Sequence, residues 1–104
     1  MTTTLPADLR IEDAAEILED CHGILFFEVD ARNDSYEAWS ALAAEHGERI
    51  AVAQQRGNEL IISWHYDHKP VAWWIRSAFR AVGMRATWEG GIEHAVHVDL
   101  APRR

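Results

Sequence analysis

A chain of 104 residues that is 48% hydrophobic has the length and the apolar content of one folded domain, which excludes a largely disordered protein. Its 17 acidic and 10 basic side chains give a net charge of -7, and this charge opposes binding to nucleic-acid phosphates or anionic membranes through bulk electrostatics. A single cysteine excludes an internal disulfide, and the sequence has neither a secretory leader pattern nor an apolar run long enough for a membrane helix, so we expect a cytoplasmic protein.

The first predicted element is an amphipathic helix that begins at residue 6 or 8, runs to residue 21 and is ended by Gly23. Apolar residues recur at helical spacing on one side, namely Ile11, Ala14, Ala15, Leu18 and Cys21. Cys21 is therefore predicted to be a small core residue rather than a nucleophile. Acidic residues occupy the opposite side, namely Glu12, Asp13, Glu16, Glu19 and Asp20. Such a stripe is usually a solvated helix face, and the alternative is a docking surface for a basic partner.

The rest of the chain contains two more helices and five extended segments. Asp34 with Glu37 fits the capping box of a second helix, which Gly47 ends. A third helix follows Pro70, a residue tolerated in a first helical turn, and Gly83 ends it. Apolar runs and side-chain alternation predict five strands, over residues 24–29, 50–54, 60–65, 84–88 and 92–100.

The order of these elements predicts a single α+β domain over residues 1–104. The middle six elements, βαββαβ, match a ferredoxin-like split βαβ core, with an N-terminal helix before it and an extra C-terminal strand after it. This pattern predicts an antiparallel sheet in the order 5-4-1-3-2, with the fifth strand at an edge and the strongly apolar strands 1 and 3 in the centre. The second and third helices would then cover one face. The first helix, or a second copy in a homodimer, would cover the partly apolar other face.

Alternation along the strands places Glu28, Arg85 and His97 near one end of that other face. The plain interpretation is an ion-pair network on a half-exposed sheet. The alternative is a small-molecule or metal-binding enzyme in which Glu28 is a general base, Arg85 holds an anion and His97 completes the site. His65 and His68 are weak candidates for metal ligands, because no cysteine pair or third nearby histidine completes a set, and the alternative is that both are solvated. No cofactor is predicted.

Trp73 is hard to explain as a core residue. By helical spacing it points away from the apolar side of the third helix and lies with Arg76 and Arg80. An exposed tryptophan beside arginines is typical of a binding hot spot, and the alternative is a ring that lies flat over the helix against Arg76. We therefore predict binding rather than catalysis: a small acidic interaction domain, of the inhibitor, immunity or antitoxin type, that binds a basic protein without contacting nucleic acid or membrane. The predicted partner-binding residues are Trp73, Arg76, Arg80, Glu12, Glu16 and Glu19.

Overall fold

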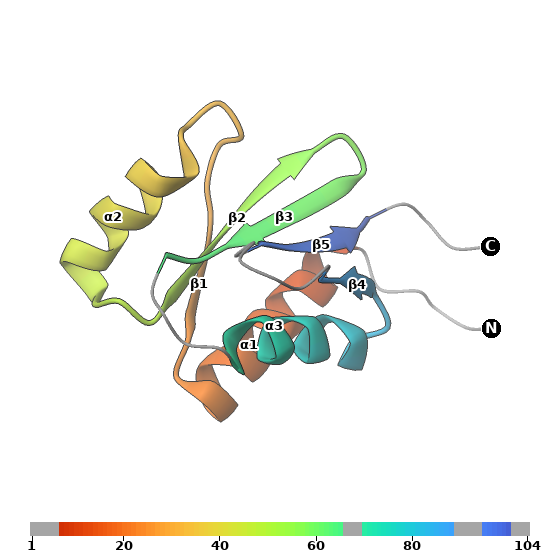
Figure 1. Ribbon diagram of the computed structural model, residues 1–104. Coiled ribbons are helices and arrows are strands. Elements are labelled where there is room, and N and C mark those ends of the chain that lie inside the picture. The colour runs from red at the N-terminus through yellow and green to blue at the C-terminus, as the bar shows by residue number, and fades with distance from the viewer. Residues whose placement is uncertain (1–6, 66–69, 89–94, 101–104) are drawn as a thin grey trace.

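A computed structural model describes residues 7–65, 70–88 and 95–100, and Figure 1 shows the arrangement of their helices and strands. The helices are α1 (Ala7–His22), α2 (Ser35–His46) and α3 (Pro70–Ala81). The strands are β1 (Leu25–Glu28), β2 (Ile50–Arg56), β3 (Glu59–Ser63), β4 (Arg85–Thr87) and β5 (Ala95–Asp99). Each predicted helix and strand has a counterpart here, so the predicted α+β class is confirmed. None of these three helices combines the length and the apolar character that a membrane span requires.

The five strands form one mixed sheet in the order β1-β2-β3-β5-β4. β1 and β2 are parallel neighbours connected through α2, whereas the other three pairs are antiparallel. The predicted ferredoxin-like order 5-4-1-3-2 is therefore wrong. β1 lies at an edge of the sheet instead of its centre, and β5 lies between β3 and β4 instead of at an edge.

β1 is apolar on both faces without being a central strand, because helices cover it from both sides. On one face Phe26 packs against the core below α1 and α3, where its ring centroid lies 5.8 Å from that of Phe79. On the other face Leu25 and Phe27 pack with Trp39 of α2. An edge strand between two layers of helices thus has the same continuous apolar pattern as a central strand, and the pattern alone does not separate the two positions.

The helices form two layers, one on each face of the sheet (Figure 1). α1 and α3 pack next to each other over the main core, to which the sheet contributes Ala51, Ala53, Leu60, Ile62, Ala86, Val96 and Val98. α2 packs on the opposite face, over β1 and β2. The prediction that the second and third helices share one face is therefore wrong. α1 does cover the face of Ile24 and Phe26, as one of the two alternatives had it, so that apolar face is covered within one chain.

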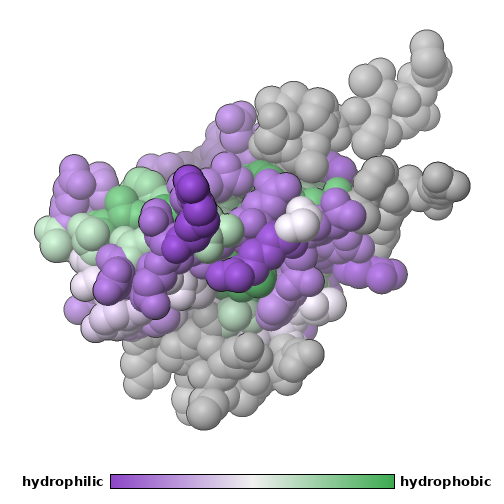
Figure 2. Space-filling model, turned by 90° about the horizontal axis from the view of Figure 1, so that it is seen from above, coloured by the Kyte–Doolittle hydropathy of each residue, from purple (hydrophilic) through white to green (hydrophobic). Residues whose placement is uncertain are grey.

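The cap of α2 and a buried hydrogen bond fix its position. The Asp34 side chain accepts the backbone N–H of Glu37 at 3.0 Å, which confirms the predicted cap. Trp39 Nε1 donates to the carbonyl of Ile50 on β2 at 3.2 Å. Because α2 is anchored over β1 and β2, no described helix lies over the same face of β3, β5 and β4. Figure 2 looks onto this side of the molecule, where many hydrophilic residues gather beside the more apolar region of α2 on the left.

Candidate functional site

The part of the sheet that α2 leaves open carries a row of charged side chains across four strands. Arg85 of β4 lies opposite Asp99 of β5 in the strand register, and Asp99 lies opposite Glu59 of β3. Glu59 in turn lies opposite Arg56 of β2. Directly paired residues project to the same face of a sheet, so the row has the charge order plus, minus, minus, plus.

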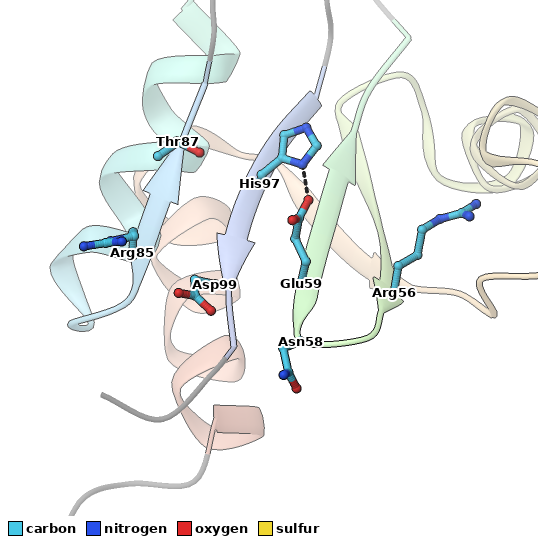
Figure 3. Close-up of a pocket in the computed structure, with 7 residues that line it drawn as sticks. All are labelled: Arg56, Asn58, Glu59, Arg85, Thr87, His97 and Asp99. Atoms are coloured by element: carbon cyan, nitrogen blue, oxygen red, sulfur yellow. Dashed lines mark hydrogen bonds and ion pairs between the residues drawn. The ribbon is translucent and has the colours of Figure 1, made fainter. Parts of the chain in front are cut away.

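The sheet is hollowed over this row. The hollow has a volume of about 430 Å³, and Figure 3 shows the residues that line it: Arg56, Asn58, Glu59, Arg85, Thr87, His97 and Asp99. Within it, His97 Nδ1 is hydrogen-bonded to a carboxylate oxygen of Glu59. A carboxylate can only accept, so Nδ1 carries the proton and Nε2 remains for another partner. Both side chains are partly exposed, so this contact orients the imidazole more than it stabilises the fold.

The predicted cluster of Glu28, Arg85 and His97 is not formed. Arg85 and His97 line the same hollow, but Glu28 lies on β1 at the far edge of the sheet. Glu28 lies opposite Ala53 of β2 in the strand register, and the Ala53 side chain belongs to the core below α1 and α3. Glu28 therefore projects to the α1–α3 side of the sheet, away from the hollow. The carboxylate beside His97 is that of Glu59, which the sequence analysis did not single out. The side-chain alternation of β3 places Glu59 on the same face as Ile61, but only the pairing of β3 with β5 brings it beside His97.

His65 lies beside the aromatic side chains of α2. Its ring centroid is 5.2 Å from that of Tyr36 and 5.6 Å from that of Trp39, both in edge-on geometry. The second weak metal candidate, His68, falls outside the described residues. Among the residues that the structure does describe, no three histidine, cysteine or acidic side chains are grouped as a metal ion requires.

The outer face of α1 is acidic and exposed. All five predicted acidic side chains lie in solvent, and none forms an ion pair with another described residue: Glu12, Asp13, Glu16, Glu19 and Asp20. Ile11 and Leu18 on the opposite side are buried, which confirms that the helix is amphipathic. Cys21 is exposed, contrary to the prediction. In this last turn the packed position belongs to His22, whose ring stacks on Trp74 of α3 with 4.4 Å between centroids.

Trp73 on α3 is exposed and is also held in place by its neighbours. It retains 55% of its accessible surface. Its ring lies edge-on to Trp88 with centroids 6.4 Å apart, and the guanidinium carbon of Arg76 lies 4.8 Å from the Trp73 ring centroid. The nearby Arg80 is anchored separately, because its Nε donates to the Ala86 carbonyl at 3.0 Å. The predicted exposure of Trp73 and its contact with Arg76 thus occur together in one arrangement, named here the Trp73 cluster (Trp73, Arg76 and Trp88).

Comparisons with protein-family models, with curated proteins and with solved structures found no match to this chain. Its function is therefore inferred from the chemistry of three surfaces: the hollow, the acidic face of α1 and the Trp73 cluster. The acidic face and the Trp73 cluster belong to the α1–α3 layer, whereas the hollow lies on the other side of the sheet.

Proposed function

We propose that this chain is a protein-interaction domain that binds a partner with a basic surface, as an inhibitor, immunity or antitoxin-type protein does. The binding surface is the outer side of α1 and α3, which lie next to each other on one face of the sheet (Figure 1). The observation that carries the proposal is the exposure of Trp73 on a helix whose other face is buried. Tryptophan and arginine are the side chains most enriched among interface hot spots.

Restriction of the Trp73 ring before binding favours this role. Arg76 lies over the ring and Trp88 lies at its edge, so the side chain already has a limited set of orientations. Binding through a side chain that is already restricted costs less conformational entropy than binding through a freely rotating side chain. Trp73 is therefore suited to serve as the apolar anchor at the centre of the interface.

The charge of α1 determines the kind of partner. Glu16 has four acidic neighbours at helical spacings of three or four residues, and like charges at these spacings destabilise a helix: Glu12, Asp13, Glu19 and Asp20. No described cation pairs with any of them. A basic surface on a partner would relieve this repulsion, accelerate the encounter and make binding weaken as salt concentration rises.

Affinity capture from extracts of the organism that encodes the gene tests the proposal. The wild-type chain is compared with a variant neutralised on α1, Glu12→Gln/Glu16→Gln/Glu19→Gln. We expect the wild type to retain a protein of basic isoelectric point, and we expect the variant to lose most of it. A matched control removes three negative charges from α2 and the turn that follows it, Glu37→Gln/Glu45→Gln/Glu48→Gln. This control should retain the partner.

The contribution of the aromatic anchor is tested with Trp73→Ala. Its control is Tyr36→Ala, because Tyr36 on α2 is similarly exposed, at 58%. With the purified partner, we expect Trp73→Ala to weaken binding at least about tenfold, whereas Tyr36→Ala has little effect. Capture of only neutral or acidic proteins, or equal capture by the α1 and α2 charge variants, would refute the proposed function.

A further inference from the structure

The outer side of the α1–α3 layer carries charges of both signs. Its α1 part is acidic, and its α3 part carries Arg76 and Arg80 next to the exposed Trp73. Among the described residues, no carboxylate forms an ion pair with either arginine, just as no cation pairs with the acidic face of α1. Each half of this surface therefore lacks an opposite charge of the kind that the other half carries.

The packing of α1 against α3 fixes how the two charge patterns are aligned. The ring of His22, the last residue of α1, stacks on Trp74 near the start of α3, with 4.4 Å between the ring centroids. From this contact the two helices extend toward the same side of the molecule (Figure 1). Both rise by about 1.5 Å per residue. A residue six positions before His22 is therefore level with one six positions after Trp74, and these two residues are Glu16 and Arg80.

A second copy of the chain supplies both missing charges at once. A two-fold axis that runs between α1 and α3, in the plane of the helix layer, places α1 of each copy over α3 of the other. Such an axis keeps every residue at its level along the axis. Glu16 of one copy then faces Arg80 of the other, and Asp20 faces Arg76 in the same way. Because the contact is symmetric, each ion pair forms twice.

The outer side of α3 has a shape that suits a facing helix. Ser77 and Ala81 are exposed there, and their small side chains leave room between the larger Trp73 and Arg80. Arg80 is already held by the hydrogen bond from its Nε to the Ala86 carbonyl, and its terminal nitrogens remain to donate to a carboxylate. The ring of Trp73, one residue before Trp74, would be covered by the end of α1 of the second copy.

We propose that the chain forms a homodimer in which α1 of each copy packs on α3 of the other, through the pairs Glu16–Arg80 and Asp20–Arg76. Helices of 16 and 12 residues are about 24 Å and 18 Å long, so the shared face is smaller than a standard interface and the dimer is weak and reversible. The dimer does not depend on the proposed function, although a basic partner would have to displace the second copy from the same surface.

Analytical ultracentrifugation of the full chain tests the dimer without any partner. About 150 mM salt, with a Debye length of about 8 Å, screens the long-range repulsion between two chains of net charge -7. We expect a reversible monomer–dimer equilibrium for the wild type. Arg80→Glu and Glu16→Arg each place like charges opposite one another in the dimer, so each should weaken it at least about tenfold.

A mixture of the two variants identifies the contact. In a dimer of one Arg80→Glu chain with one Glu16→Arg chain, both Glu16–Arg80 contacts again join opposite charges. The equimolar mixture should therefore dimerise like the wild type, although neither variant does so alone. Arg32→Glu and Glu45→Arg are the controls, because they change the net charge by the same amounts at exposed positions outside the α1–α3 layer. Each control should dimerise nearly as well as the wild type.

Three results would each overturn the proposed dimer. The first is a wild-type chain that stays monomeric up to about 1 mM. The second is that Arg80→Glu and Glu16→Arg dimerise like the controls, and the third is that their mixture stays monomeric. Since no partner is present in these samples, none of these results bears on the affinity capture that tests the proposed function.

Discussion

At the scale of single residues, Trp39 connects α2 to the sheet. It is 8% exposed, and its Nε1 donates to the carbonyl of Ile50 at 3.2 Å. Trp39→Phe keeps an aromatic ring in the core but leaves that buried carbonyl unpaired and a small void beside it. We expect a loss of about 2 kcal/mol in the free energy of unfolding, measured by urea denaturation. Tyr36→Phe at an exposed position of the same helix is the control, and an equal effect of the two changes would contradict this role of Trp39.

Asp30 and Arg32 form a local ion pair in the loop before α2. The Asp30 carboxylate accepts from the Arg32 side chain at distances of 2.9 to 3.3 Å and from its backbone N–H at 2.9 Å. These contacts, the side-chain hydrogen bond first, lower the pKa of Asp30 below its ordinary value of 3.8. The carboxylate is thus more acidic in the folded chain, so its stabilising contribution is present above pH 3.8 and is lost as the pH falls through the lowered pKa.

Arg32→Gln removes the main cause of this shift. We expect the pKa of Asp30 to rise toward its ordinary value in the variant, as followed by a carboxyl-carbon NMR titration of the folded chain. Asp34 in the same spectra serves as an internal reference, since Arg32 makes no hydrogen bond to it. An unchanged Asp30 titration would show that the ion pair does not persist in solution.

At the scale of secondary-structure elements, α1 carries a charge pattern that opposes its own stability. Glu16→Gln removes four unfavourable contacts at helical spacing, each of which costs a few tenths of a kcal/mol. We expect the free energy of unfolding to increase by about 1 kcal/mol at low salt and by less at high salt, because salt screens the repulsion in the wild type. Glu45→Gln on α2, which has no acidic helical neighbour of this kind, is the control. Destabilisation by Glu16→Gln would mean that the acidic face supports the fold.

Local signals in the sequence predict the elements themselves. The periodicity of α1, the Asp34 cap and the position of Gly47 depend only on neighbouring residues, and the structure bears them out. Sheet order depends instead on which strands meet across long stretches of chain. β1 has the composition of a central strand because two helix layers cover it. A sheet order that puts β1 in the centre therefore places Glu28 in the wrong part of the sheet.

The hollow was therefore only partly predictable. The pairing of β4 with β5 follows from their proximity in sequence, and it brings Arg85 and Thr87 beside His97 and Asp99. Glu59 reaches His97 only because β5 inserts between β3 and β4, a long-range pairing that alternation within one strand does not reveal. The exposure of Trp73 was visible in the sequence, since the apolar spacing of α3 excludes it from the buried side.

At the scale of the whole molecule, the sheet separates two unlike surfaces. One side presents α1 and α3, with exposed carboxylates and the Trp73 cluster, and the other presents α2 beside an open hollow lined by charged side chains (Figures 1 and 2). The net charge of -7 would attract a basic partner from a greater distance than a single charged patch would.

The most direct test of partner binding through α1 and α3 is a titration of the labelled chain with the purified captured protein, followed through backbone amide resonances. We expect the perturbed signals to come from the exposed positions of α1 and from the surroundings of Trp73, with an affinity that falls as salt concentration increases. Perturbations confined to β3, β5 and β4, with the α1 and α3 signals unmoved, would contradict the proposed function.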